Sequence, residues 1–105
     1  MTFVLVYITT KDKAQALSIG KILVEERLAA CVNVIDNMTS IYHWDGKINT
    51  DDEAVLIAKT TTEKFQPLTN RVKELHSYTC PCIVSLPITG GNEGYLDWLA
   101  EQTGG

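Results

Sequence analysis

The chain lacks an excess of positive charge, a long apolar run and an even number of cysteines. Nine Lys and Arg residues stand against thirteen Asp and Glu residues, which gives a net charge of −4 at pH 7. Nucleic-acid binders usually carry clustered positive charge, so this balance argues against a phosphate-binding surface. The longest apolar run, Phe3 to Ile8, is far shorter than the roughly 20 residues of a membrane-spanning helix, and it has no basic flank typical of a signal peptide. We therefore expect a cytoplasmic protein that binds neither nucleic acid nor membrane.

The three cysteines, Cys31, Cys80 and Cys82, need no disulfide to explain them, so we expect reduced thiols. Several enzyme signatures are also missing. There is no glycine-rich loop that could cradle a phosphate, no Gly-x-Ser-x-Gly elbow and no His-Glu-x-x-His sequence. The nucleophiles and bases that are present form no recognisable triad. The sequence therefore predicts a protein that is not an enzyme and that needs no cofactor to fold.

One domain is predicted over residues 1–105, because the length is typical of a single domain and no linker or repeat interrupts the chain. The predicted elements are a strand buried on both faces at Phe3–Ile8, a helix to about Arg27, a strand at Ala29–Ile35 continued by Met38–Trp44, a strand at Glu53–Thr60, a helix containing Leu68, Val72 and Leu75, a strand at Cys82–Leu86 and a last helix capped by Asn92. This βαββαβ order with an added C-terminal helix predicts the α+β, ferredoxin-like class, with helices on one face of one sheet.

The first two helices can be described more closely. Thr9 or Thr10 is expected to cap the first helix, and Thr60-Thr-Thr-Glu63 resembles a capping box for the second. The first helix is expected to bury an apolar stripe at helical spacing. Its members are Leu17, Gly20, Leu23, Val24 and Leu28.

The strongest local signal is Asp45-Gly46, a dipeptide typical of a two-residue hairpin turn with positive φ at both positions. Strand character extends on both sides of it far beyond the usual five or six residues, and Asp36-Asn37 is expected to form a bulge in the first arm. A ribbon of this length overhangs any sheet that the chain can build. Its outer part needs a cover, and another copy of the chain is the simplest one. In the predicted sheet the second and fourth strands are the edges, and Pro81 and Pro87, which bracket the fourth, suit an edge better than the centre of a sheet. Pairing between copies could therefore close a ring.

Metal binding is the better candidate chemistry. Cys80-Pro81-Cys82 places two sulfurs on one face of an extended segment, and His76 lies four residues before Cys80. Thiolate and imidazole suit Cu(I), Cu(II) or zinc. The alternative is that both cysteines pack as small apolar side chains, as Cys31 is expected to do at a helix-to-strand junction. Cys31 and Cys82 are predicted on opposite sheet edges, roughly 14 Å apart, so a site containing both would form between copies.

Tyr42 and Trp44 share one face of the first hairpin arm. An exposed aromatic stripe of this kind is an interface between proteins more often than a ligand site. His43, between them, is expected to be a polar residue on a wet face. These aromatic residues therefore add to the argument for contact with another copy.

Taken in order, several segments resemble the CutA divalent-cation-tolerance proteins over essentially the whole chain. They are Glu25-Glu-Arg-Leu-Ala-Ala-Cys-Val-Asn33, Met38-Thr-Ser-Ile-Tyr-His-Trp-Asp-Gly-Lys47, Lys59-Thr60, His76-Ser-Tyr78, Leu86-Pro-Ile88 and Tyr95-Leu-Asp-Trp98. The resemblance implies a ferredoxin-like fold assembled as a homotrimer with edge strands paired between copies. It also implies a cytoplasmic protein linked to tolerance of copper and other divalent metal ions, with no settled enzymatic activity.

The resemblance supports His76 and Cys31 as metal-ligand candidates, because they fall in its His-x-Tyr-x-x-Pro and Ala-Cys-Val motifs. The usual Pro-Glu of the family is Pro81-Cys82 here. Some bacterial members implicated in copper binding have a cysteine in place of Ile8 and a histidine in place of Leu75. Cys80 and Cys82 are therefore expected to shift a copper site towards Cu(I) chemistry.

Two other functions stay open. The ferredoxin-like trimer is also the plan of the PII signalling proteins, which bind nucleotides and effectors between subunits. A small-ligand sensor or adaptor without a metal role is accordingly the alternative function, on fold analogy alone. The other is a structural module with no ligand, in which His76, Tyr78 and the cysteines pack an interface.

Overall fold

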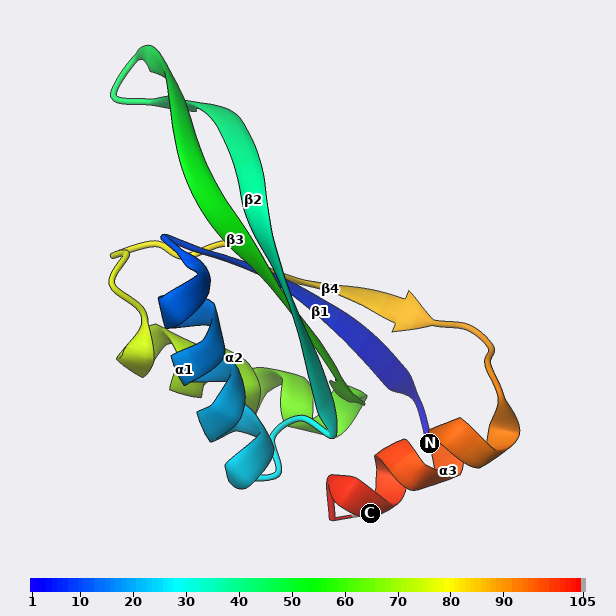
Figure 1. Cartoon of the computed structure of the whole chain (residues 1–105). Coiled ribbons are helices and arrows are strands. Elements are labelled where there is room, and N and C mark those ends of the chain that lie inside the picture. The colour runs from blue at the N-terminus through cyan, green and yellow to red at the C-terminus, as the bar shows by residue number, and fades with distance from the viewer. Residues whose placement is uncertain (105) are drawn as a thin grey trace.

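Strand β1 (Phe3–Thr10) lies inside a four-stranded antiparallel sheet with the order β2-β3-β1-β4 (Figure 1). The structure is a computed structural model that describes residues 1–104. The other elements are α1 (Lys13–Glu25), β2 (Cys31–Trp44), β3 (Lys47–Thr61), the 3₁₀ turn η1 (Thr62–Lys64), α2 (Phe65–Leu75), β4 (Ile83–Ile88) and α3 (Glu93–Gln102). The predicted βαββαβ order with an added helix is confirmed, and so is the α+β, ferredoxin-like class.

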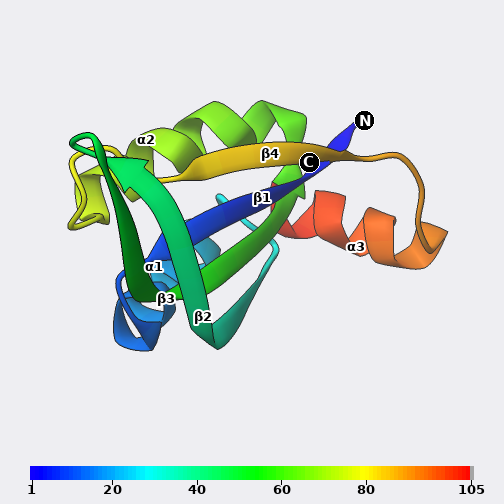
Figure 2. The same ribbon diagram turned by 90° about the horizontal axis from the view of Figure 1, so that it is seen from above.

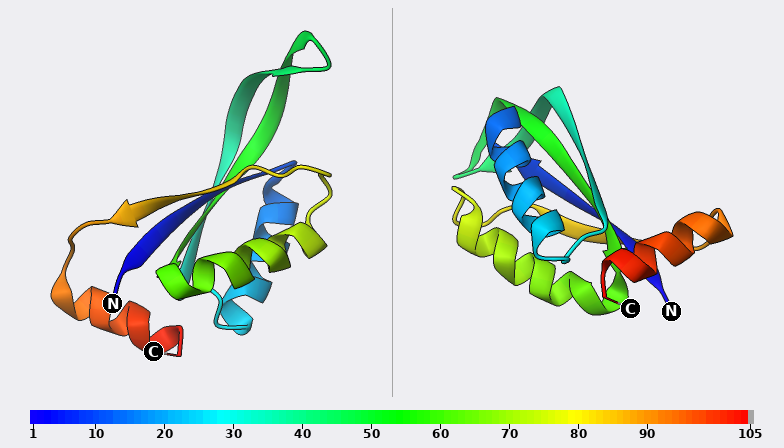
Figure 3. Two further views of the ribbon diagram at one scale, coloured as in Figure 1. Left: turned by 180° about the vertical axis from the view of Figure 1, so that it is seen from behind. Right: turned by 60° about the horizontal axis from the view of Figure 1, so that its bottom comes forward.

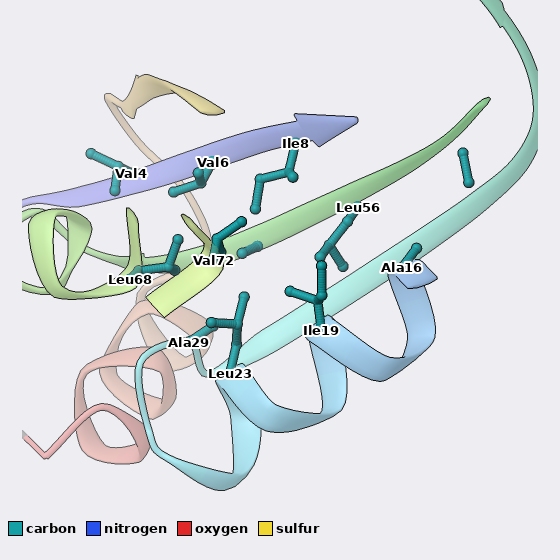
Figure 4. Packing of buried hydrophobic residues seen from close by; sticks show 12 residues of the cluster. Val4, Val6, Ile8, Ala16, Ile19, Leu23, Ala29, Leu56, Leu68 and Val72 are labelled. Atoms are coloured by element: carbon teal, nitrogen blue, oxygen red, sulfur yellow. The ribbon is translucent and has the colours of Figure 1, made fainter. Parts of the chain in front are cut away.

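Helices α1 and α2 cover one face of the sheet, and the core lies between them and the strands (Figure 3). Every second residue of β1 is buried, which is the alternation of a strand with one covered face. The prediction that this strand is buried on both faces is wrong, because Leu5 and Tyr7 are only half-buried on the face without helices. Figure 4 shows how the strand and helix side chains of the core meet. Among them are Val6, Ile8, Leu56, Ile19, Leu23, Leu68 and Val72.

Helix α1 buries Gly20 and Leu23 of the predicted stripe, but the rest of its buried face is shifted around the helix. Its buried residues are Ala16, Ile19, Gly20 and Leu23, whereas the predicted members Leu17 and Val24 are 51% and 39% exposed. The small residues of the helix determine which of its faces packs against the sheet. A Cβ at Gly20 would lie 3.0 Å from Val32 Cγ2 and 3.1 Å from Leu56 Cδ1, so the missing side chain lets the helix backbone approach the sheet closely.

The starts of the first two helices also differ from the prediction. Asp12, and neither of the two threonines before it, caps α1, because its side chain accepts a hydrogen bond of 2.8 Å from the Gln15 amide. The Thr10 hydroxyl instead donates to the Asp12 carbonyl at 2.9 Å. The capping box predicted at Thr60 does not form. Thr60 stays in β3, where its hydroxyl donates to the Leu28 carbonyl at 2.7 Å.

The long hairpin forms as predicted. Asp45 and Gly46 have φ angles of 52° and 71°, the left-handed values that a two-residue turn of this kind requires. Pairing of β2 with β3 runs out to Trp44 opposite Lys47, whereas β1 reaches only Ala54 of β3. The outer parts of β2 and β3 therefore project beyond the sheet as a two-stranded ribbon (Figure 1).

The predicted bulge interrupts β2 at Asp36-Asn37. The last pair before it is Ile35 with Val55 and the first pair after it is Met38 with Glu53, so two residues of β2 stand against one of β3. Asn37 has a φ of 59°, in the left-handed region that asparagine tolerates better than most residues. The extra residue reverses which face of the ribbon receives even-numbered side chains of β2.

Strand β4 pairs with β1 alone and is a sheet edge, as its prolines predicted. It begins at Ile83, one residue later than expected, and extends to Ile88. Helix α3 starts at the predicted cap, where the Asn92 side chain accepts from the backbone amides of Gly94 and Tyr95. It lies near the N-terminus, at the end of the molecule away from the hairpin tip (Figures 1 and 2). Within residues 1–104, no helix has both the length and the apolar character to cross a bilayer.

Candidate functional site

The segment between α2 and β4 faces the base of the projecting hairpin across a hollow of about 590 Å³. We call it the Glu53 hollow after the one charged side chain in its lining. In Figure 2 the tip of the hairpin and this segment lie at the same end of the molecule. The main contributors are Thr9 of β1, Tyr42 and Trp44 of β2, Glu53 of β3, and Tyr78, Cys80 and Cys82 of the segment.

The bulge in β2 is what brings the hairpin aromatics to this hollow. Before it, Ile35 lies opposite Val55, and after it Met38 lies opposite Glu53. Side chains alternate along a strand, so Tyr42 and Trp44 share the face of Met38. Without the extra residue they would point to the opposite face of the ribbon. The bulge therefore groups two aromatic rings with the Glu53 carboxylate.

Glu53 is only 9% exposed, although it is a charged residue at the margin of the sheet. Its Oε2 accepts a hydrogen bond of 2.8 Å from the Tyr78 hydroxyl, which comes from the segment after α2. Within residues 1–104 no cationic side chain forms an ion pair with Glu53, and its other oxygen receives no hydrogen bond. The hollow therefore contains a largely buried negative charge whose partner is a neutral phenol.

Two phenols near the hollow are held in their protonated form. Burial, and then the hydrogen bond to Glu53, raise the pKa of Tyr78 well above its ordinary value. A hydrogen bond to Asp51 raises the pKa of Tyr42 in the same direction. Both hydroxyls act as donors to carboxylates, Tyr78 to Glu53 and Tyr42 to Asp51.

His76 lies beneath Tyr78 as a buried, fully hydrogen-bonded residue. Its backbone amide ends α2 by donating to Val72, and its Nδ1 accepts from the Tyr78 amide at 3.0 Å. An amide can only donate, so the proton of the neutral ring is on Nε2, which donates to the Thr9 carbonyl at 2.8 Å. The rings of His76 and Tyr78 are 4.7 Å apart. His76 thus ties the segment to β1 and positions Tyr78 towards Glu53.

Cys80 and Cys82 are both exposed at the rim of the hollow. The prediction that they pack as buried apolar side chains is wrong within one chain. Residual burial raises the pKa of the Cys82 thiol, a hydrogen bond with Thr9 lowers it, and the Glu53 carboxylate raises it again, so that the net shift is upward. The thiol form is favoured until an electrophile or metal ion displaces the proton.

Cys31 lies far from the other candidate ligands. It is the first residue of β2 and pairs with Lys59, whereas Cys82 lies beside Thr9. The two cysteines are separated by three strand spacings, roughly 14 Å, and by four residues of β1, about 13 Å along the strand. Cys31 is half-buried and lies where the connection from α1 enters β2. Across residues 1–104 no three His, Cys, Asp or Glu side chains are grouped so that they could hold a metal ion.

Glu53 and Thr9 line the hollow although the sequence did not predict either as a site residue. Glu53 was seen only as the start of a strand. Its spacing from Val55 was the available signal. Residues two apart in a strand share one face, so Glu53 places a carboxylate on the same face as an apolar side chain. Thr9 carried no signal, because its role depends on backbone contacts with His76 and Cys82 that are more than 60 residues away.

The raised pKa of Tyr78 predicts how stability changes in alkaline solution. Above pH 10, the ordinary pKa of tyrosine, the unfolded chain loses the Tyr78 proton while the folded chain keeps it, so the free energy of unfolding falls as pH rises. The wild type is expected to lose stability more steeply between pH 9 and pH 11 than Tyr78→Phe. Urea unfolding at a series of pH values measures this slope. Tyr95→Phe, on α3, is the control, and equal slopes in all three proteins would contradict the prediction.

The fold and the hollow together define a ferredoxin-like α+β protein with a buried carboxylate, aromatic walls and exposed thiols at one end of its sheet. A family model described as "CutA1 divalent ion tolerance protein" matches residues 4–102. The chain belongs to this family. The resemblance noted in the sequence is thereby confirmed.

The relatives are similar over most of the chain. The divalent-cation tolerance protein CutA of Thermus thermophilus is 56% identical over 99 residues, which cover 94% of this chain and 96% of that protein. Its solved structure has a TM-score of 0.95 at 54% identity and covers 97% of this chain and 99% of that one. A solved structure from Archaeoglobus fulgidus, titled a periplasmic divalent cation tolerance protein, has a TM-score of 0.94 at 42% identity over 96% of this chain and 98% of that one.

A chloroplastic CutA of Arabidopsis thaliana is 40% identical over 100 residues, 95% of this chain. The chain spans about half the length of this plant relative, 55%, and of its rice counterpart, 56%. The ferredoxin-like part is thus what the chain shares with these longer proteins. The relatives from Thermus thermophilus and Archaeoglobus fulgidus are named as divalent-cation tolerance proteins.

Proposed function

We propose that this chain acts in divalent-cation tolerance as a cytoplasmic, copper-binding homotrimer that is not an enzyme. Membership of the divalent ion tolerance family supports the role in tolerance. The observation that carries the choice of metal is the pair of exposed thiols at the rim of one hollow, Cys80 and Cys82. Thiolates favour Cu(I), and mixed sulfur and nitrogen ligands also accept Cu(II).

In this proposal Cys80 and Cys82 supply the first two ligands. Side chains two residues apart in an extended segment point the same way, so both sulfurs can approach one ion. His76 is the third candidate, and it would have to release the Tyr78 amide from Nδ1 in order to bind metal. Cys31 lies on the opposite sheet edge and would have to come from a neighbouring copy.

Exposed apolar side chains on both sheet edges support the homotrimer. Edge strand β2 exposes Ile35 and Ile41 at 53% and 70%, and edge strand β4 exposes Val84 and Leu86 at 50% and 52%. Large apolar side chains gathered at unpaired strand edges favour contact between copies. Pairing of a β2 edge with a β4 edge repeats from copy to copy and closes a ring. Such a ring is also the arrangement that would bring Cys31 of one copy towards the thiols of another.

Copper per chain is the test of this function. The reduced protein is equilibrated with copper, washed against a chelator of intermediate affinity and analysed for metal, after light scattering has given the mass of the assembly. A whole-number ratio of copper to protein and three chain masses are expected. The double variant Cys80→Ser, Cys82→Ser is expected to lose the copper, because serine hydroxyls are poor ligands for soft metal ions.

Cys31→Ser is the matched control, since it removes one thiol far from the pair. Retention of copper in Cys31→Ser and its loss in the double variant would assign the ion to the Cys80 and Cys82 pair. Loss in both would assign it to a site between copies. Copper near zero in the wild type would overturn the proposal, and the four candidate residues would then be structural.

A further inference from the structure

We propose that His76 binds copper through Nδ1, and that the segment 76–78 must first open to release the Tyr78 amide from that nitrogen. This inference rests on the proposed copper function and deepens it. It assigns the ligating atom of His76, and it couples copper binding to a local opening held shut by a side chain of α1. The hydrogen bonds that carry it all join parts of one chain.

The hydrogen bonds of the His76 ring select the nitrogen. Nε2 carries the proton of the neutral ring and donates it to the Thr9 carbonyl at 2.8 Å. Histidines that bind a metal ion usually donate their other ring N–H to a carbonyl or carboxylate, which fixes the tautomer and the orientation of the ring. His76 has this supporting bond already in place. Nδ1 is therefore the atom whose lone pair can bind a metal ion while the ring keeps its proton.

The Tyr78 amide occupies that lone pair. Its nitrogen lies 3.0 Å from Nδ1, and one lone pair cannot accept a hydrogen bond and bind a metal ion at the same time. Rotation of the ring would free Nδ1 only by breaking the bond to Thr9, in a residue that is 9% exposed. The backbone at Tyr78 must therefore move away from the ring.

Two side-chain bonds oppose this movement. Gln15 of α1 donates from Nε2 to the Ser77 hydroxyl at 2.8 Å, and the Tyr78 hydroxyl donates to Glu53 of β3 at 2.8 Å. The Lys11 amide donates to Oε1 of Gln15 at 3.0 Å, which orients the Gln15 side chain. Together with the bond from the histidine ring to β1, three consecutive residues are tied to three different elements.

The closed segment lowers the apparent affinity for copper. When only a small fraction of a protein is in the state that binds, the apparent affinity is reduced by that fraction. A variant that opens the segment more often should therefore bind copper more tightly, by the same factor. A purely structural role of the segment predicts the opposite, because loosened ligands must be ordered again on binding.

Ser77→Ala tests the inference in the intact reduced protein. It removes the bond from Gln15, and hydrogen exchange of the Tyr78 amide, followed by NMR, is expected to become about two- to tenfold faster, the range of one hydrogen bond. Cu(I) affinity, measured against a competing chelator, is expected to rise by the same factor. Ser18→Ala is the matched control, because Ser18 is exposed on α1, and it is expected to change neither quantity. Unchanged exchange in Ser77→Ala, or faster exchange without tighter binding, would overturn the inference.

Gln15→Met removes the same bond from its other end. It is expected to reproduce both changes, and the double variant Gln15→Met, Ser77→Ala is expected to change no more than either single variant, because only one bond is lost. Additive effects would overturn the role of this bond.

Isotope-edited nitrogen NMR of the His76 ring separates failure of this inference from failure of the proposed function. In the copper-loaded protein the Nδ1 resonance is expected to shift, while Nε2 keeps its proton and its bond to Thr9. Copper bound without a shift at Nδ1 would overturn the inference and leave the thiol site in place. Copper near zero in the wild type would overturn the proposed function and this inference with it.

Discussion

Leu56→Ala is expected to lower the free energy of unfolding by about 2–5 kcal/mol, the range measured for removal of a large aliphatic side chain from a core. Leu56 is 0% exposed and lies in β3, opposite Ile8 of β1 and Val34 of β2. Its Cδ1 is at the point where the backbone of α1 comes closest to the sheet, beside Gly20. Neighbours that are already in close contact can collapse only partly into the space left by the lost methyl groups, so a cavity remains.

Ile48→Ala is the control for this prediction. The same strand carries Ile48 on the projecting hairpin, where it is 70% exposed, so its truncation is expected to change the folding stability of a chain by less than about 0.5 kcal/mol. Guanidinium unfolding at equal chain concentrations measures both variants. If another copy covers the hairpin, the effect of Ile48→Ala will depend on protein concentration and that of Leu56→Ala will not. Equal losses at every concentration would contradict the assignment of the core.

The features of the fold that could be predicted from the sequence are those fixed by neighbouring residues. The turn at Asp45-Gly46 and the bulge at Asp36-Asn37 each depend on a backbone with positive φ. Only a few residue types tolerate such a backbone, so the local sequence is enough to predict both features. Pro87 indicated an edge strand for the equally local reason that it cannot donate to a second neighbour. Such signals are independent of the rest of the molecule, and all three were confirmed.

The phase of helix α1 could not be predicted from the sequence, because two apolar stripes are possible on it. Leu17 and Val24 continue one stripe, and Ala16 and Ile19 continue the other. Hydrophobicity favours the first, since alanine is a weak contributor. Close approach to the sheet favours the second, because small residues let the helix backbone come nearer to the strands. Only the packed structure shows that the second effect is larger.

The candidate site was predictable only in part. The exposed thiols and His76 stood out as residue types with metal chemistry. Glu53 did not, because its partner Tyr78 is 25 residues away and reaches it through a segment without regular structure. The sequence correctly placed Tyr42 and Trp44 on one strand face, but the second wall of the hollow comes from beyond α2. Contacts between segments that are distant in the chain leave no periodic pattern to detect.

His76→Ala is expected to lower the free energy of unfolding by about 1–3 kcal/mol, because it leaves two partly buried backbone groups without their hydrogen-bond partner. The Tyr78 amide loses its acceptor and the Thr9 carbonyl loses its donor. His43→Ala is the control, since the other histidine of the chain lies exposed near the tip of the hairpin and is expected to contribute less than about 0.5 kcal/mol. Thermal and denaturant unfolding measure the difference, and equal small effects in the two variants would show that the bonds of His76 do not hold the segment.

Two further variants separate positioning by His76 from metal ligation by His76. Asn can place its amide oxygen where Nδ1 accepts from Tyr78, and Gln can place its amide nitrogen where Nε2 donates to Thr9, so each is expected to restore about half of the lost stability. Neither amide is a good ligand for copper. If His76 only positions the segment, copper binding will recover together with stability in these variants. If His76 is itself a ligand, copper will stay absent although the segment is held in place, because the imidazole nitrogen is then the group that the metal requires.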